Sequence, residues 1–514
     1  MHELIDRVGP DRLGQVFQSA LVVAPAGLDF VVLTDAVQAL VDHHDALRAR
    51  LELEPERRLV VPETAAAGAW TQRVDATGLE GDDLGGLIRE QAQAAVDRLD
   101  PRAGVMVQVV WFDAGPDTPG RLLVVVDHLV VDGVSWRLLA PDLAETYAAL
   151  AEGRDIALDA VPTSFRHWAR ELAVQAESEE TRAELPQWTE LLKGPDPMLT
   201  SRPVDPDRDI EATMRHLSVT VPSEVTSALL TSVPAAFHAG IDDVLLTGLT
   251  AAIAEWRDGR STAGGFLVDV ESHGRVPLSE GDDLSRTVGW FTSAYPVRLD
   301  VGAVDLADVR AGGPAAGRAV KRVKEQLRAV PGDGLGYGML RYLNPETAPE
   351  LAALPSAQIG FNYLGRFTAG AADEEVQKDW SPAGEAGPGA GVLGEFSVMH
   401  ALEVIGVVDE SADGPQLTLT VAWPERLLDE AAAEALLGSW AAMLTGLVSH
   451  VSRPGSGGRT PSDFPLVALD QGRIEQLEAD VPGLAEVLPV SPLQEGMLFH
   501  ALFDEQGTDV YVEQ

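Results

Sequence analysis

The chain has 514 residues and contains no cysteine. Without a thiol it forms no disulfide, offers no thiolate nucleophile and holds no cysteine-ligated zinc or iron–sulfur site. Long apolar runs are also missing, since none reaches the roughly 18 apolar residues that span a bilayer. The opening stretch MHELIDRVGPDRLGQ lacks the apolar segment of a signal peptide. These absences predict a cytoplasmic protein without a membrane partner.

Basic residues are scarce. Lys and Arg number 38 against 80 Asp and Glu, which gives a formal net charge of −42. A polyanion of this size repels nucleic-acid backbones and anionic membrane surfaces, and no clustered basic stripe overrides the average. Nucleic acid is therefore not an expected partner. The preference for arginine, alanine and glycine is typical of a GC-rich bacterial coding sequence.

Helix and strand patterns alternate in two halves of the chain. With 45% hydrophobic residues, its length suits roughly two to four domains. Residues 33–51 have apolar side chains at helical spacing, and 121–127 form a valine-rich run typical of a strand covered on both faces. Residues 241–259 repeat the helical pattern in the second half. Strand-like runs follow at residues 265–275, 358–367 and 416–424. The alternation predicts an α/β fold with two lobes.

Two ionisable residues stand where a predicted strand runs into a loop. His128 follows LLVVVD and Glu271 follows FLVDV, and a glycine comes soon after each, at Gly133 and Gly274. Strand ends that feed loops commonly carry catalytic groups on a rigid scaffold. If the lobes face each other, such a pair can remove a proton from one face of a carbon and return another to the opposite face. The pKa of the glutamate must then be raised by burial from about 4.3 for it to act as an acid near neutrality. A core histidine with a satisfied hydrogen bond is the simpler alternative for His128.

Other histidines and a glycine-rich segment are interpreted as structural. His43 and His44 lie at the end of an amphipathic helix, where histidine is favourable beside the carbonyl ends. No His-x-x-x-His pair or carboxylate triad accompanies His128 or Glu271, so no metal site is predicted. The segment GDGLGYG (332–338) lacks the Lys-Ser/Thr ending of a phosphate loop and is typical of a turn with glycines at special dihedral angles.

Six motifs occur in order along residues 1–450. They are DHLVVDGVSW (127–136), VESHGR (270–275), TVGWFTSAYPVRL (287–299), GLGYGMLRYL (334–343), FNYLGRF (361–367) and MHALEVIGVV with LTLTVAW (399–408 and 417–423). Together they resemble the motifs of epimerization domains of nonribosomal peptide synthetases, members of the condensation-domain superfamily. In the first motif Ser135 is followed by Trp136, whereas peptide-bond-forming relatives more often show Trp and then Ser.

The resemblance implies two chloramphenicol-acetyltransferase-like lobes arranged as a V-shaped pseudo-dimer with a central tunnel. A peptidyl carrier protein would dock and insert its phosphopantetheine arm, which bears an aminoacyl or peptidyl thioester. The chain would need no cofactor of its own. His128 and Glu271 would face the Cα, where removal of its proton gives an enolate and reprotonation from the other side converts L into D.

Supporting roles follow from the same resemblance. Arg275, Asn362 and Tyr363 match family positions near the site, where an enolate oxygen or the catalytic pair is stabilised. Asp132 is expected to hold its loop through an ion pair rather than to touch substrate. The family's first histidine is Asp127 here, which is expected to alter the basicity of His128 if the two side chains are close.

The resemblance and the composition predict the order of domains. The expected parts are the N-terminal lobe with a truncated first motif (1–180), an inter-lobe linker (181–205), the C-terminal lobe (206–450), a second linker (451–486) and the incomplete start of a following condensation domain (487–514). The chain is thus expected to be a fragment of a larger synthetase, with adenylation and condensation domains as neighbours.

Two alternatives stay open beside an isomerase of antibiotic biosynthesis. One is a condensation domain that forms a peptide bond on the same scaffold; the other is a catalytically silent module that only docks carrier domains. The order Ser135–Trp136, the presence of Glu271 and the FNYLG segment favour epimerization over condensation. The presence of both His128 and Glu271 argues against a silent module.

Overall fold

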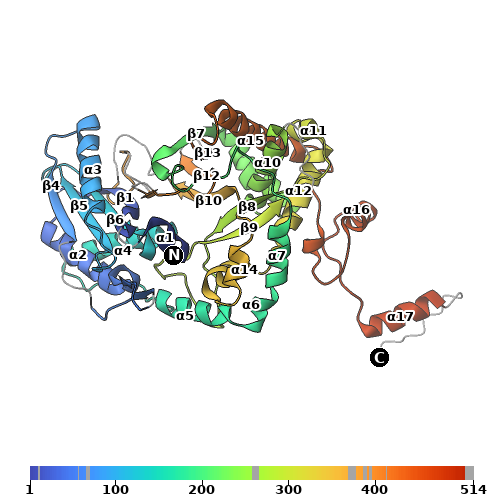
Figure 1. Ribbon diagram of the computed structural model, residues 1–514, viewed down its shortest axis with the longest axis horizontal. Coiled ribbons are helices and arrows are strands. Elements are labelled where there is room, and N and C mark those ends of the chain that lie inside the picture. Colours follow the sequence, from blue (N-terminus) through green and yellow to red (C-terminus); the bar gives the residue numbers. More distant parts are fainter. Residues whose placement is uncertain are drawn as a thin grey trace. The chain divides into compact units, whose positions relative to one another are not determined.

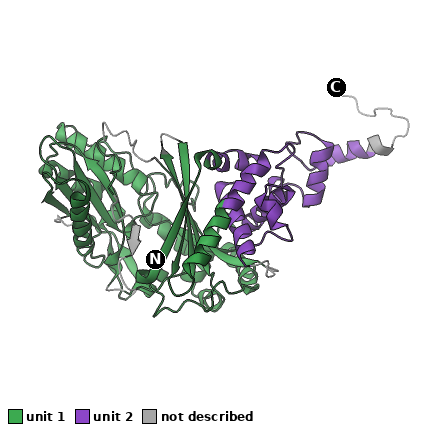
Figure 2. Cartoon of the chain, turned by 90° about the horizontal axis from the view of Figure 1, so that it is seen from above, with its two compact units in different colours: residues 1–226, 259–299, 330–441 green, residues 227–258, 300–329, 442–514 purple. Residues whose placement is uncertain are grey.

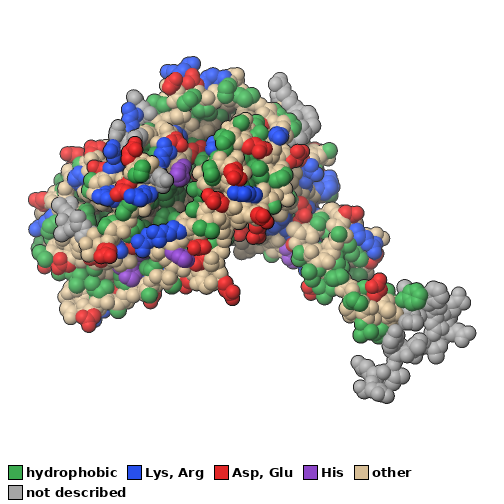
Figure 3. All heavy atoms as spheres, turned by 60° about the horizontal axis from the view of Figure 1, so that its bottom comes forward, with side chains coloured by type: hydrophobic (Ala, Val, Ile, Leu, Met, Phe, Trp, Pro, Cys, Tyr) green, Lys and Arg blue, Asp and Glu red, His purple; other side chains and the backbone are tan. Residues whose placement is uncertain are grey.

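The computed structural model divides into two compact units. It describes residues 1–9, 12–55, 57–64, 70–257, 265–368, 378–385, 390–392, 396–411 and 414–503. Unit 1 comprises residues 1–226, 259–299 and 330–441, and unit 2 comprises residues 227–258, 300–329 and 442–514 (Figure 2). On the face shown in Figure 3, acidic and basic side chains are interspersed.

The first sheet of unit 1 has the strand order β11-β1-β6-β5-β4. Its strands are β1 (Val16–Ala24), β4 (Thr71–Asp75), β5 (Val107–Asp113), β6 (Gly120–Asp127) and β11 (Ala390–Val392). Strand β6 lies at the centre and is buried along nearly its whole length, as its valine run predicts. Its last residue, Asp127, pairs with Phe17 of β1, so Gln18 lies beside the end of β6.

Helices cover both faces of this sheet (Figure 1). Helix α3 (Gly81–Val96) shares a core with Val125 of β6, whereas α2 (Phe30–His43) and α4 (Trp136–Ala151) share another with Val126. Neighbouring residues of a strand point to opposite faces, so one apolar run supplies both cores. Because helices pack on both faces of the sheet, they fix the position of the end of β6, where the loop that carries His128 begins.

The second sheet of unit 1 has the strand order β7-β13-β12-β10-β8-β9. Its strands are β7 (Met214–Val221), β8 (Phe266–Ser272), β9 (Ser293–Leu299), β10 (Ile359–Thr368), β12 (Leu402–Ser411) and β13 (Gly414–Pro424). Strands β8, β10 and β12 run parallel, β9 and β13 pair antiparallel with β8 and β12, and β7 pairs antiparallel with β13. Glu271 therefore lies near the carboxyl end of β8, beside β10.

Shorter elements complete unit 1. They are α1 (His2–Val8), η1 (Leu13–Gln15), η2 (Asp45–Arg48), β2 (Arg50–Glu52), β3 (Arg58–Val60), η3 (His128–Val130), α5 (Phe165–Ala176), α6 (Glu179–Ala183), α7 (Leu185–Lys193), η4 (Glu211–Thr213), α13 (Leu335–Gly338), η5 (Met339–Leu343) and α14 (Ala348–Ala352). Helix α7 falls within the range 181–205 that was expected to be a linker.

Helices make up the described secondary structure that lies wholly within unit 2. They are α9 (Ser232–Phe237), α10 (Ile241–Trp256), α11 (Leu306–Arg310), α12 (Pro314–Arg328), η6 (Pro461–Asp463), α16 (Gln471–Asp480) and α17 (Pro492–Phe503), while α8 (Ser223–Leu230) and α15 (Glu430–Val451) begin in unit 1. The segment after residue 451 is fastened to α12, because the buried ammonium of Lys324 lies 2.7 Å from both carboxylate oxygens of Asp463. Residues 504–514 of the expected downstream domain lie outside the described residues, and the predicted domain boundaries stay predictions.

The strands expected at residues 121–127, 265–275, 358–367 and 416–424 are confirmed as β6, β8, β10 and β13. The helix expected over 33–51 was too long. It ends at His43, because His44 takes an extended backbone and its buried ring bonds Asp142 at 2.8 Å. The turn expected over GDGLGYG is present only in its first half, with positive φ at Gly332 and Gly334, because Leu335–Gly338 form helix α13.

One described helix, α15, is long and apolar enough to cross a membrane by length and composition, although no run of the sequence itself was expected to do so. A second candidate arises only if α8 and α9 are joined to α10 across a bend of 98°. Half of the apolar window of α15 is buried inside the protein, and buried core helices pass the same test. This is weak evidence for a membrane span.

Candidate active site

His128 is the first residue of η3, directly after β6. The turn begins there because Asp127 caps it, accepting a hydrogen bond from the Leu129 amide at 2.9 Å. The imidazole packs on the indole of Trp290, with ring centroids 4.5 Å apart. Burial lowers the pKa of His128, and the backbone at His128 and Val131 and the charge of Asp132 oppose that effect only in part. The ring is therefore neutral at pH 7 and able to accept a proton.

A glutamine that the sequence interpretation missed contacts this ring. The Nε2 atom of Gln18 lies 3.2 Å from Nε2 of His128, and Oε1 of Gln18 lies 2.8 Å from the indole Nε1 of Trp136. The three side chains come from β1, η3 and α4, so only the folded first lobe brings them together. Trp136, which the first motif singled out, is thus linked to His128 through Gln18.

Glu271 lies on β8, where Asn362 of the neighbouring strand β10 donates a hydrogen bond to its Oε2. The carboxyl keeps contact with solvent although protein atoms surround it closely. Burial raises the pKa of Glu271 to about 7, and the charge of Glu403 raises it further, whereas His400 and Asn362 oppose the rise. Glu271 thus exchanges a proton near neutrality, as the proposed acid or base requires.

A buried imidazolium lies next to Glu271. His400 Nδ1 is 2.8 Å from Glu403 Oε1, and its Nε2 is 3.0 Å from Asp269 Oδ2. Carboxylates only accept hydrogen bonds, so both ring nitrogens carry protons. Burial lowers the pKa of His400, but the charges and hydrogen bonds of Glu403 and Asp269 outweigh that effect and hold it well above 6.5.

Strand register explains why this cluster acts on Glu271. Asp269, Gly360 and Glu403 are paired across β8, β10 and β12, so their positions form one row. Glu271 lies two residues beyond Asp269 on the same face of β8. His400 fits over the row because residue 360 is a glycine: a Cβ there would lie 2.6 Å from His400 Nδ1.

The cluster predicts opposite pKa changes in two variants. His400→Gln removes the positive charge between two carboxylates and should raise the pKa of Glu271 by about one unit, whereas Glu403→Gln removes a negative charge and should lower it by a similar amount. A carbon-13 NMR titration of the glutamate carboxyls, with Glu271→Gln to assign the signal, measures both. Shifts of the same sign in the two variants would contradict this electrostatic interpretation.

An ion pair and hydrogen bonds join the loop after His128 to the loop after Glu271. Arg275 Nη2 lies 2.9 Å from Asp132 Oδ1 and 3.1 Å from Ser135 Oγ. The other oxygen of Asp132 accepts from the Phe291 amide at 3.2 Å. This confirms that Asp132 holds its loop through an ion pair. Breaking such a buried pair leaves an uncompensated charge, which costs roughly 3–5 kcal/mol.

Ser135 and Arg275 both make hydrogen bonds at this junction between the two loops. Ser135 Oγ donates to Asp132 Oδ1 at 2.7 Å and accepts from the Gly289 amide at 3.2 Å, and the side chain is fully buried. The guanidinium of Arg275 lies 4.3 Å from the Phe291 ring centroid and donates to two backbone carbonyls. Its contacts belong to the loop junction, and a role in stabilising an enolate stays a prediction.

Contacts also relate the two candidate catalytic groups. Trp290, which touches His128, lies four residues before Ala294, and Ala294 pairs with Glu271 in the β8–β9 ladder. Within the described chain no hydrogen bond or ring contact joins His128 to Glu271 directly. Tyr363 is half-buried and pairs with Gly406 in the β10–β12 ladder, and its expected supporting role stays a prediction.

Asp127 is fully buried, and its Oδ2 has no hydrogen-bond partner among the described residues. Burial raises the pKa of Asp127 to about 8, so the group is protonated at pH 7 and adds no charge beside His128. An unfolded aspartate titrates near 3.9. Between these values the folded chain holds a proton that the unfolded chain releases, so stability falls as the pH rises from about 4 to about 8.

Asp127→Asn should remove this dependence. Relative to the wild type, the variant should gain about 1.4 kcal/mol of unfolding free energy for each pH unit, or roughly 3 kcal/mol between pH 5 and pH 7. Urea denaturation at the two pH values measures the difference, and Asp117→Asn at an exposed position is the matched control. A constant difference between variant and wild type would show that Asp127 is ionised in the folded chain.

The paired histidines at 43 and 44 form part of an ion-pair cluster. Their ligand atoms and those of Asp142 lie within 4.8 Å of one another. Both oxygens of Asp142 are bound by Arg286 at 2.7 and 2.8 Å, which places a positive charge where a cation would sit. We therefore interpret these residues as structural.

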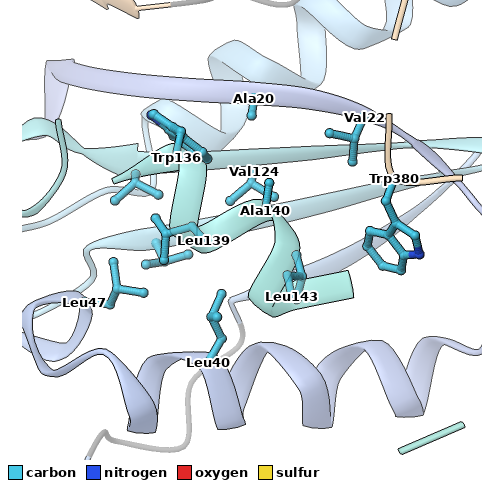
Figure 4. A pocket seen from close by; sticks show the side chains of 12 residues that line it. Ala20, Val22, Leu40, Leu47, Val124, Trp136, Leu139, Ala140, Leu143 and Trp380 are labelled. Carbon is cyan, nitrogen blue, oxygen red and sulfur yellow. The ribbon is translucent and has the colours of Figure 1, made fainter. Parts of the chain in front are cut away.

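A small apolar pocket lies among α2, α4 and the first sheet (Figure 4). Trp136 and Trp380 line it together with aliphatic side chains. Its volume of about 30 Å³ admits one or two water molecules, so it is too small for an amino-acid side chain. It is a packing void behind Trp136 rather than a substrate site.

A family model described as the condensation domain matches residues 14–465. The chain belongs to the condensation-domain family. This condensation-family chain is 37% identical over 511 residues to one of the linear gramicidin synthase proteins of Brevibacillus parabrevis, covering 96% of the chain and 6% of that protein. It is also 37% identical over 513 residues to another protein of the same synthase, with 96% and 9% covered. The chain thus spans less than a tenth of the length of these relatives.

Solved structures of the condensation superfamily resemble the chain. The epimerization domain of the third module of tyrocidine synthetase B aligns with a TM-score of 0.71 and 29% identity, covering 85% of this chain and 92% of that one. The first condensation domain of the calcium-dependent antibiotic synthetase shares the fold, with a TM-score of 0.60, 20% identity and coverage of 88% and 95%. The predicted fold class and family resemblance are confirmed.

The sequence predicted roles for His128 and Glu271, which stay predictions, and the ion pair of Asp132, but it assigned no role to Gln18, Asp269 or Gly360. His400 and Glu403 stood inside the quoted motif MHALEVIGVV, which was a usable signal. Gln18 had none, because its role depends on a side chain 110 residues away.

Proposed function

We propose that this condensation-family domain epimerises the Cα of an aminoacyl or peptidyl thioester, from L to D, within a nonribosomal peptide synthetase. The substrate is presented on the phosphopantetheine arm of a peptidyl carrier protein. The observation that supports this most is the pair of titratable groups: a neutral His128 and a Glu271 whose pKa is raised by burial to about 7.

The proposed reaction moves one proton off the substrate and another on. One group of the pair takes the Cα proton as the C–H bond breaks, and the electron pair passes into the thioester carbonyl as an enolate. The other group, in its protonated form, delivers a proton to the opposite face of Cα. Burial lowers the pKa of His128, so its ring is neutral and can accept a proton, and Glu271, with a pKa raised to about 7, can donate or accept one near neutrality.

The similarity to a solved epimerization domain, at 29% identity, supports the same assignment. The curated relatives are parts of a peptide synthase, so we expect the carrier, adenylation and condensation domains of a bacterial antibiotic synthetase as partners. The expected cytoplasmic location belongs to this proposal.

Peptide-bond formation is the second candidate, since the matching family model is described as the condensation domain. Condensation needs a base for the attacking amine but has no use for a second group that titrates near pH 7. A silent docking module would need neither group.

Stereochemical analysis separates these candidates. A carrier loaded with an L-aminoacyl thioester is incubated with the domain, the thioester is hydrolysed, and the released amino acid is resolved on a chiral column. A mixture of L and D is expected. Recovery of L alone, together with dipeptide once an acceptor-loaded carrier is added, would assign condensation instead.

A further inference from the structure

The hydrogen bonds around Gln18 determine which way its amide faces. The indole Nε1 of Trp136 is a donor only, so the Gln18 atom 2.8 Å away must be the carbonyl oxygen. The amide nitrogen of Gln18 then faces His128 Nε2 at 3.2 Å. An amide nitrogen only donates, so Nε2 of the imidazole must accept.

The proton of the neutral ring is thereby placed on Nδ1. That nitrogen is buried and has no partner of full hydrogen-bond geometry among the described residues. A proton on Nε2 would point at the Gln18 amide hydrogens, and Gln18 cannot turn over without leaving the Trp136 indole unpaired. Turning Gln18 over would leave the buried indole N–H unpaired at a cost of roughly 1–3 kcal/mol, whereas the backbone at His128 and Val131 interacts favourably with a protonated imidazole nitrogen.

We propose that Gln18 is a positioning residue which, held by Trp136, keeps the ring of His128 neutral with its proton on Nδ1 and Nε2 as its unprotonated nitrogen. This gives the tryptophan of the Ser135–Trp136 pair a physical task, because a side chain without an indole N–H leaves the amide free to turn. The assignment of the ring proton does not depend on the reaction; only its catalytic consequence rests on the proposed function.

Other charged groups near His128 act on its pKa from other elements. Asp132, in the loop that follows η3, raises it, and the amino group of Met1 lowers it. Asp127 is protonated at pH 7, because burial raises its pKa to about 8. None of these groups contacts Nε2. A change in the pKa of His128, or in the position of its ring proton, in a Gln18 variant can therefore be attributed to Gln18.

Nitrogen-15 NMR of histidine-labelled protein tests the proposal without a substrate. The chain has 11 histidines, and the signal of His128 is assigned by its loss in His128→Gln. In the wild type we expect a neutral ring at pH 7 with the proton on Nδ1. A proton on Nε2, or a charged ring at pH 7, would overturn the proposal.

Two variants extend the test. Gln18→Glu presents a carboxylate that accepts from Nε2–H, which should raise the pKa of His128 by about one to three units. Trp136→Phe frees the amide to turn its oxygen toward the ring, which should move the proton to Nε2. Trp380→Phe is the matched control, because Trp380 lines the same pocket at the other end from Trp136 in Figure 4. An unchanged ring in Gln18→Glu, or equal changes in both tryptophan variants, would overturn the proposal.

The catalytic consequence is a pH profile. In Gln18→Glu the epimerization rate should fall about tenfold for each unit by which the raised pKa of His128 exceeds the pH, and the rate should recover as the pH rises. Loss of rate at every pH would mark a merely structural role and overturn the positioning assignment. If the wild type does not epimerise while the NMR results hold, the proposed function fails and the positioning assignment stands.

Discussion

Replacing His128 by alanine is expected to lower the rate of L-to-D conversion by a factor of about 10² to 10⁴, the usual contribution of a positioned general base or acid. The side chain supplies one of the two proton transfers, and the adjacent Asp127 cannot replace it, because that group holds its own proton at pH 7 through a burial-raised pKa of about 8. The measurement is the initial rate of D-isomer formation on a loaded carrier. His216→Ala, at an exposed position on β7, is the matched control and should retain full activity.

The fold should survive this change. The His128 ring contacts Gln18 through a side-chain hydrogen bond and Trp290 through ring packing. Its removal leaves the Asp132–Arg275 junction intact, so circular dichroism and the unfolding midpoint should stay close to those of the wild type. A folded alanine variant with wild-type conversion would remove His128 from the mechanism.

Glu271→Gln is expected to reduce conversion by a similar factor. The amide keeps the shape of the carboxyl and can remain hydrogen-bonded to Asn362, but it can neither take nor release a proton near pH 7. The loss therefore reports proton transfer rather than packing. Glu224→Gln, at an exposed position on α8, is the matched control.

The two variants should also differ in a way that assigns the faces of Cα. A single remaining base can exchange only the hydrogen that points at it. In deuterated solvent, Glu271→Gln should exchange Cα–H of one enantiomer with retention of configuration, and His128→Ala should exchange that of the other enantiomer. Exchange of both enantiomers by either variant would contradict the assignment of one group to each face.

The strands and the candidate pair were predictable because their signals are local. An unbroken valine run predicts a strand that is buried on both faces. This strand, β6, is followed directly by η3, which begins at His128. The end of α2 was not predictable, since His43 and His44 continue the helical pattern and only the contact of His44 with Asp142 on α4 stops it.

The fine structure of the site depends on partners that are distant in sequence. Gln18 reaches His128 across the β1–β6 pairing, and a glutamine within a largely apolar strand carries no chemical signal of its own. The cluster beside Glu271 depends on strand register, which places Asp269, Gly360 and Glu403 in one row. A sequence without its pairing pattern does not reveal such a row.

The ion pair of Asp132 shows the opposite case. The family resemblance implied that Asp132 holds its loop through an ion pair, and Arg275 supplies the partner at 2.9 Å. The expectation succeeded because a buried carboxylate requires a cation or several donors wherever the chain finds them.

Solvent deuterium exchange at Cα tests the proposed epimerization most directly. The wild-type domain and a carrier loaded with an L-aminoacyl thioester are incubated in deuterated water, and the released amino acid is examined by mass spectrometry and chiral chromatography. We predict one deuterium at Cα and the appearance of the D-isomer at a matching rate. An amino acid that stays L and carries no deuterium would contradict the proposed function.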